Sequence, residues 1–129
     1  MNISLQVENF KKLGIVADQI AHYEGLIKEI DEMKVERFAN SFGEVETIQV
    51  AHLVGKVVFH MERAEPVVSA YAFHDRDWSP EWALNSFSSQ KAAEAYAAAA
   101  LERHLTEAAK TIRAQSKTLL AALRAATGE

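Results

Sequence analysis

The sequence predicts an α+β fold in which long helices precede and follow a short antiparallel meander. Hydrophobic residues recur in steps of three and four over about residues 9–34, and they alternate in steps of two over residues 46–74. An alanine-rich stretch without proline or glycine then fills residues 88–126. The first and third patterns are typical of helices, and the second is typical of strands with one buried face.

The composition favours one domain that is held together by packing alone. The chain has 129 residues, 49% of them hydrophobic, and it contains no cysteine. This length is near the common size of a single domain, so we expect residues 1–129 to form one. A protein without disulfides fits the cytoplasm. Residues 1–14 lack the basic start and apolar run of a signal peptide, and we expect a cytoplasmic protein that does not enter a membrane.

The first helix is expected over about residues 9–34, with Asn9 as its N-cap. Its apolar stripe consists of Leu13, Val16, Ile20, Tyr23, Ile27 and Ile30. Gly14 lies inside this pattern and costs a helix about 1 kcal/mol relative to alanine. The preceding residues 3–7 alternate like a short strand, so the start of the helix stays open.

The meander is expected to begin with a hairpin. One face of its first strand carries Ile48, Val50 and His52, and one face of the second carries Val57, Phe59 and Met61. A two-residue loop at Val54 and Gly55 aligns these two sets. A third strand is expected over residues 67–73. Residues 80–87 form either a short helix or a fourth strand.

The last helix, over residues 88–126, is longer than a compact body of this size. At 1.5 Å per residue it extends about 57 Å, whereas a compact chain of this length has a diameter of about 36 Å. Either the helix projects and packs against the first helix or a second copy of the chain, or it breaks near residues 115–117 and folds back. Its apolar residues keep a heptad spacing, so we expect a homo-oligomer through the helices.

Patterns that carry catalysis or metal binding are weak, and we predict no catalytic residue, no metal and no cofactor. His60 and Glu62 form an H-x-E triplet of the kind found in zinc-dependent deaminases, but those enzymes also need a C-x-x-C pair. No two of the five histidines lie four residues apart. His52 shares the apolar face of its strand and is expected to lie in the core.

Residues 75–82 form the favoured interaction site. Two tryptophans flank Pro80 in a charged loop, and tryptophan is among the residues most enriched in interface hot spots. The expected partner-binding residues are Trp78, Trp82, Asp75, Arg76 and Asp77. The alternative for either ring is that it covers the open end of the sheet.

A row of cations on the last helix is a second candidate surface. The first 102 residues carry nine basic and sixteen acidic side chains, whereas the last 27 carry five basic and two acidic. The row consists of Arg103, Lys110, Lys117 and Arg124, with Arg113 beside them. Such a row could contact phosphates. Acidic residues of the first helix are the favoured complement, namely Asp18, Glu24, Glu29, Asp31 and Glu32.

These patterns favour a non-enzymatic protein-interaction module, an adaptor or a small inhibitor of a larger protein. A compact acidic chain without a cofactor motif would suit a protein that a phage or mobile element encodes to block a bacterial system. One alternative is an oligomeric protein that holds a nucleotide or metabolite with His74, Arg76 and a tryptophan. The other is a nucleic-acid-binding helical hairpin, which the internal acidic complement makes the least favoured.

The length of the last helix generates the first prediction. Sedimentation equilibrium at micromolar concentrations should give a mass at least twice that of one chain, because a helix with an apolar stripe beyond the body needs a second surface to cover it. A strict monomer at these concentrations would contradict the prediction.

Overall fold

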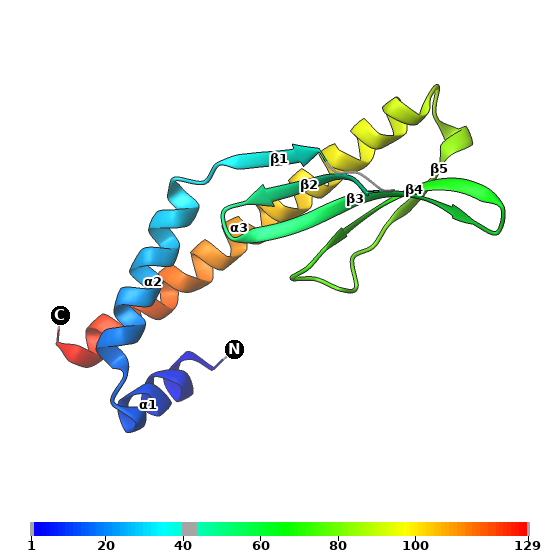
Figure 1. Ribbon diagram of the computed structural model, residues 1–129. Coiled ribbons are helices and arrows are strands. Elements are labelled where there is room, and N and C mark those ends of the chain that lie inside the picture. The colour runs from blue at the N-terminus through cyan, green and yellow to red at the C-terminus, as the bar shows by residue number, and fades with distance from the viewer. Residues whose placement is uncertain (1, 40–43, 129) are drawn as a thin grey trace. The chain divides into compact units, whose positions relative to one another are not determined.

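A computed structural model describes residues 2–39 and 44–128 and confirms the α+β fold (Figure 1). The elements in chain order are α1 (Ile3–Leu13), α2 (Val16–Asp31), β1 (Val35–Ala39), β2 (Glu44–Val50), β3 (Leu53–Glu62), β4 (Glu65–Ala72), β5 (Glu81–Ala83), the short 3₁₀ helix η1 (Leu84–Ser86) and α3 (Gln90–Thr127). The chain therefore starts with a pair of helices, and its sheet has five strands.

Two compact units make up the chain. The helical unit comprises Met1–Glu32 and Lys110–Glu129, and the sheet unit comprises Met33–Ala109. Helix α3 contributes residues to both units. The expectation of one domain over residues 1–129 stays a prediction.

Gly14 splits the single helix that was expected over residues 9–34. Its φ of 69° lies in the left-handed region, which glycine adopts without a steric penalty. The N–H of Gly14 donates to the carbonyl oxygen of Lys11 at 3.1 Å, and the N–H of Ile15 donates to that of Phe10 at 3.1 Å. This hydrogen-bonded end is a common helix C-cap. The prediction of one continuous helix is therefore wrong.

The first helix also begins earlier than expected. The side-chain oxygen of Asn2 accepts a hydrogen bond from the N–H of Leu5 at 3.0 Å, so Asn2 is the N-cap of α1. The expected cap, Asn9, lies inside α1, and the strand-like alternation of residues 3–7 belongs to a helix. Alternation over so few residues does not separate a strand from one side of a short helix.

The core of the helical unit consists of buried aliphatic residues from α1, α2 and the C-terminal part of α3, namely Val7, Ile20, Leu119, Leu120 and Leu123. Ile30 of the predicted stripe is buried as well. Leu13, its first member, is exposed, because the end of α1 at Gly14 separates it from the helix that carries the rest.

The sheet is an antiparallel meander with the strand order β1-β2-β3-β4-β5. It confirms the expected meander and extends it at both edges. β1 was not predicted, and β5 resolves the ambiguity of residues 80–87 in favour of a three-residue strand followed by η1. Arg37 of β1 forms ion pairs with Glu46 of β2 at 3.5 Å and with Glu102 of α3 at 3.2 Å.

The first hairpin turns earlier than expected. Its two-residue loop is Ala51–His52, because Val50 pairs with Leu53. Gly55, expected in the loop, lies inside β3. His52 is exposed in the turn and not in the core. The expectations for both residues are wrong. His52 lies in the turn itself, and Gly55 is required for close packing and not for turning.

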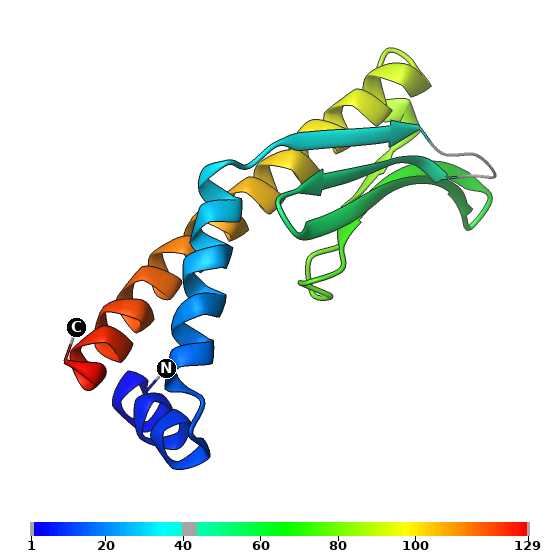
Figure 2. The ribbon, with the colours of Figure 1, turned by 60° about the vertical axis from the view of Figure 1, so that its left-hand side comes forward.

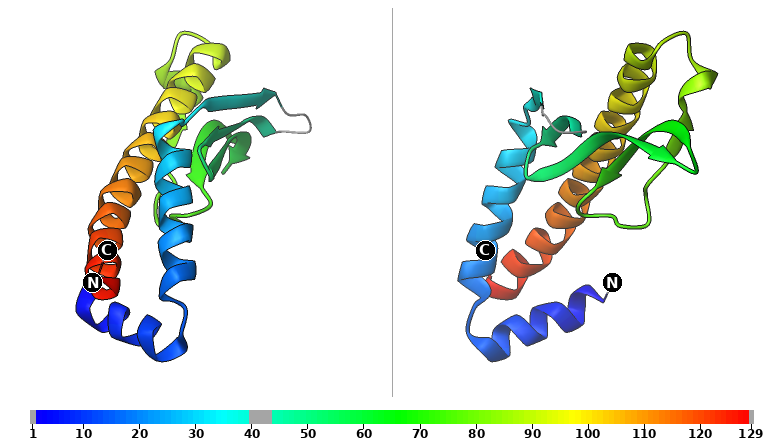
Figure 3. Two further views of the ribbon diagram at one scale, coloured as in Figure 1. Left: turned by 90° about the vertical axis from the view of Figure 1, so that its left-hand side faces the viewer. Right: turned by 45° about the vertical axis from the view of Figure 1, so that its right-hand side comes forward.

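Residues 90–109 of α3 cover one face of the sheet (Figures 2 and 3). The sheet presents Ile48, Val50, Leu53, Val57, Val68, Ala70 and Ala72 to this helix, which presents Ala93, Ala97, Ala98, Leu101 and Leu105; all are buried. The expected alignment of Ile48 and Val50 with Val57 is therefore confirmed. Alanine dominates the helix surface here, so the backbones of helix and sheet approach closely.

Helix α3 is continuous over its 38 residues, with no break at residues 115–117. The hydroxyl oxygen of Ser89 accepts a hydrogen bond from the N–H of Ala92 at 3.1 Å, so Ser89 is the N-cap of this helix. Within residues 2–39 and 44–128, no helix is both long and apolar enough to cross a membrane.

We predict that Gly55→Ala destabilises the protein. A Cβ at this position would lie 2.6 Å from Leu101 Cδ1 and 2.6 Å from the backbone oxygen of Tyr71, so the helix or the neighbouring strand must shift. Overpacking of this kind typically costs about 1–3 kcal/mol in the free energy of unfolding.

Gly25→Ala is the matched control for this substitution. Gly25 lies within α2, and a Cβ added there would have open space around it, with no neighbouring atom within 4 Å. Replacement by alanine should stabilise the helix by up to about 1 kcal/mol. Urea denaturation of both variants measures the difference, and effects of the same sign would contradict the close approach at Gly55.

Candidate functional site

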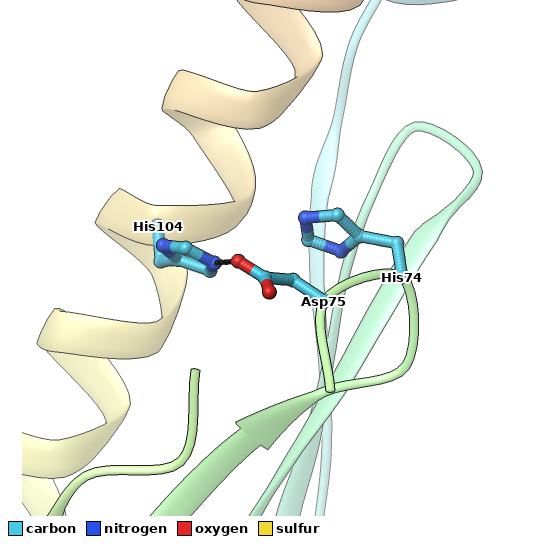
Figure 4. Close-up of side chains that lie close together, drawn as sticks. All are labelled: His74, Asp75 and His104. Atoms are coloured by element: carbon cyan, nitrogen blue, oxygen red, sulfur yellow. Dashed lines mark hydrogen bonds and ion pairs between the residues drawn. The ribbon is translucent and has the colours of Figure 1, made fainter. Parts of the chain in front are cut away.

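The turn after β4 meets the middle of α3 at a cluster of ionisable side chains (Figure 4). Asp75 Oδ2 lies 3.1 Å from His104 Nε2, and the pair is partly buried. Figure 4 shows the Asp75 carboxylate between the imidazole rings of His104 and His74. One nitrogen or oxygen of each of the three side chains lies within 4.8 Å of the other two.

Backbone hydrogen bonds and one aromatic ring hold this turn in place. The N–H of Asp75 donates to the carbonyl oxygen of Ala72 at 3.3 Å, and the N–H of Trp78 donates to that of Asp75 at 3.2 Å. The Trp78 ring stacks on His104 with centroids 4.1 Å apart and planes inclined by 4°. The imidazole of His104 is thus fixed between a carboxylate and an indole.

His74 completes the cluster from the other side of Asp75. Its ring stacks near that of His104, with centroids 5.5 Å apart and planes inclined by 24°. Desolvation by the neighbouring atoms lowers the pKa of His74 below its ordinary value, and the charges of His104 and His52 lower it further, whereas Asp75 raises it. His74 is therefore mainly neutral at and above pH 6.5, the ordinary pKa of a histidine.

The structure places four of the five predicted partner-binding residues in or beside this cluster, and the fifth, Trp82, on a strand. Asp75 and Trp78 belong to the cluster with His104, whereas Arg76 and Asp77 are exposed beside it. Both tryptophans are half-buried and contact α3. Trp82 lies on β5, where its ring makes an edge contact with Tyr96 at 5.6 Å. The partner-binding role of these residues stays a prediction.

A second ionisable cluster lies on the face of the sheet that α3 does not cover. His60 Nε2 lies 3.3 Å from Ser69 Oγ and 3.9 Å from Glu81 Oε1, and Glu62 completes the group. A hydrogen bond with the Glu62 carboxyl raises the pKa of Glu81, whereas the charge of His60 lowers it. His60 and Glu62 form the H-x-E triplet of the sequence, and Glu81 comes from a strand that the sequence left ambiguous.

Part of the basic row pairs within the helical unit, as the acidic complement suggested. Arg113 forms an ion pair with Asp31, and Arg124 forms one with Glu24 at 2.7 Å. The hydrogen bond between the first two groups lowers the pKa of Asp31 and raises that of Arg113. Arg103, Lys110 and Lys117 complete the row as exposed residues.

Sequence reasoning missed an aromatic group on the uncovered face of the sheet. Phe38 lies on β1. Tyr71 lies near the end of β4 and Phe73 directly follows that strand, and the ring centroids of Tyr71 and Phe73 are 5.5 Å apart. Phe38 was missed because its strand was not predicted. The spacing of residues 71 and 73 places them on one side of an extended chain, and this signal could have identified the pair.

Two surface pockets lie in the helical unit. One is lined by Tyr23, Leu26, Ile112, Gln115, Ser116 and Leu119, and the other by Glu24, Ile27, Lys117, Leu120, Ala121 and Arg124. Neither includes His74, Arg76 or a tryptophan, which the ligand-binding alternative requires.

We predict that Glu81→Gln gains stability relative to the unsubstituted protein as the pH rises from about 4 to about 7. A raised pKa means that the folded state holds this proton more tightly than the unfolded state. The contribution to stability is fully present below the ordinary pKa of 4.5 and is lost as the pH rises through the folded pKa. Glutamine carries no charge and avoids this loss.

Urea denaturation across this pH range provides the measurement. Glu36→Gln is the control, because Glu36 is an exposed glutamate on β1, at the other edge of the sheet. The quantity compared is the free energy of unfolding of Glu81→Gln minus that of the unsubstituted protein. If this difference stays constant with pH, or if it matches that of the control, it would contradict the interaction between the carboxyls of Glu62 and Glu81.

Comparison with known protein families, curated proteins and solved structures finds no match. The function is therefore inferred from the chemistry of this chain's own residues.

Proposed function

We propose that the protein is a non-enzymatic protein-binding module and that the sheet face opposite α3 is its contact surface. The observation that carries the proposal is the exposure of two phenylalanines, Phe38 at 47% and Phe73 at 52%. Within the described part of the sheet unit, the long helix α3 covers the other face of the sheet. Exposed aromatic side chains that share one face of a sheet are candidates for an interaction site.

The strand register explains how these aromatic side chains come to share a surface. Phe38 pairs with Thr47, Thr47 with Lys56, and Lys56 with Tyr71, which forms one row across four strands. Neighbouring strands are about 4.8 Å apart, so Phe38 and Tyr71 are separated by about 14 Å. Phe73 extends the row by its edge contact with Tyr71. We call Phe38, Tyr71 and Phe73 the aromatic row.

The polar residues around the aromatic row suit a protein partner. Thr47 and Lys56 lie between the aromatic side chains, and Gln49 lies beside them on the same face. Apolar groups among uncharged and charged polar groups are typical of the centre and rim of protein interfaces. Aromatic residues are also the type most enriched at such centres.

The nucleic-acid alternative is supported less well. Of the five cations in the basic row, Arg113 and Arg124 form ion pairs with Asp31 and Glu24 of the same unit. A cation that already faces a carboxylate contributes less to phosphate binding, because the partner must be displaced or repels the phosphate.

Site-specific photocrosslinking tests the proposal. A benzophenone amino acid at residue 38 and another at residue 73 should each form an adduct with the same protein in cells of the source organism. Tyr96 is the matched control, because it is an aromatic residue with 56% exposure and lies on α3. Adducts of equal yield at Tyr96, or no protein adduct at either phenylalanine, would contradict the proposed surface.

The crosslinked partner then allows a quantitative prediction. Phe73→Ser should weaken its binding by more than tenfold, because truncating an interface aromatic at a hot spot costs about 2 kcal/mol or more. The thermal unfolding midpoint should change little, since the side chain is half exposed. Binding at the original affinity by Phe73→Ser and by Phe38→Ser would exclude the aromatic row as the contact surface.

A further inference from the structure

The cluster at the start of the β4–β5 connection contains three side chains with nitrogen or oxygen atoms. Transition metals bind atoms of these kinds. His74 and His104 each offer a ring nitrogen, and Asp75 offers a carboxylate oxygen. They come from two segments about 30 residues apart in the sequence, and the packing of α3 on the sheet unit brings them together. The sequence places His74 and Asp75 side by side in one charged loop, but it gave no sign that His104 joins them.

We propose that His74, Asp75 and His104 bind one divalent transition-metal ion of the zinc, cobalt and nickel class. Two imidazoles and one carboxylate suit these ions, whereas magnesium and calcium prefer ligand sets made of oxygen. Three protein ligands leave at least one coordination position for water or for a group from a partner. The proposal is independent of the aromatic row, and it replaces the expectation that the protein binds no metal.

The distances are compatible with a common ion. Zinc lies about 2.0–2.2 Å from nitrogen and oxygen ligands, so two ligands at a tetrahedral angle are about 3.3 Å apart. His104 Nε2 and Asp75 Oδ2 are 3.1 Å apart and already have this spacing. The ring nitrogen of His74 lies within 4.8 Å of both. Because His74 is exposed on the turn, rotation of its side chain can supply the remaining approach.

The surroundings favour binding at this cluster. Trp78 stacks on His104 and restricts the orientation of its imidazole ring. The His104 side chain therefore loses less conformational entropy when it binds a metal ion. The side chains of His104 and Asp75 are 24% and 39% exposed, so an ion can reach them from solvent while the turn shields one side. Groups that are held in place before the ion arrives are the usual requirement for a specific metal site.

His60, Glu62 and Glu81 are the competing group among the described residues. This group offers one imidazole instead of two. Its glutamates are exposed, and His60 is only partly buried. We therefore expect any binding there to be weaker, and this group provides the matched control.

The test is a titration of the full chain, purified without a histidine tag and freed of metal by a chelator. Cobalt(II) should bind with a stoichiometry of one per chain and produce the visible absorption of a site with nitrogen and oxygen ligands. Zinc(II) should displace the cobalt, whereas an excess of magnesium should not. Absence of stoichiometric cobalt binding would overturn the proposal.

Variants assign the binding to the cluster. His74→Ala and Asp75→Asn should each weaken cobalt binding at least tenfold, and neither changes a buried apolar residue. His60→Ala, which removes the imidazole of the competing group, should leave the affinity unchanged. Circular dichroism and urea denaturation of each variant establish that it is folded. Loss of binding in His60→Ala, or full binding in both His74→Ala and Asp75→Asn, would place the metal elsewhere and overturn the proposal.

Discussion

The close approach of α3 to β3 is the constraint on which the sheet unit depends. Leu101 lies directly over Gly55, where a single additional carbon would lie 2.6 Å from the leucine side chain. The same helix surface buries three alanines, Ala93, Ala97 and Ala98. Small residues therefore determine the distance between helix and sheet, and larger aliphatic side chains fill the space beside them.

This contact also determines which groups meet at the metal-binding cluster. His104 follows Leu101 by three residues and so lies close to the same side of the helix. Because Leu101 packs over Gly55, His104 of the same helix lies next to the turn that contains Asp75. The same packing leaves the opposite face of the sheet to the aromatic row. One helix–sheet contact thus separates the cluster from the proposed protein-binding surface.

The helical unit depends on a different kind of constraint. Its chain turns at Gly14, whose left-handed backbone ends α1 and allows α2 to begin two residues later. The buried contacts among Val7, Ile20 and Leu123 then hold the three helical segments. The ion pairs of Asp31 and Glu24 with arginines of α3 lie at the surface. Such exposed pairs contribute little to stability.

The sequence by itself determined the fold class, the antiparallel meander, and the start and length of α3, because each depends on local periodicity and capping. It also indicated the acidic complement of the basic row. The five-stranded sheet was decided only in the tertiary structure, since β1 is exposed along its whole length and carries no alternating pattern. The position of Gly55 in a strand was decided there too, because the same residue type serves turns and close packing. His74, Asp75 and His104 form a cluster only after α3 packs on the sheet, and no local pattern encodes a distance between residues so far apart in the chain.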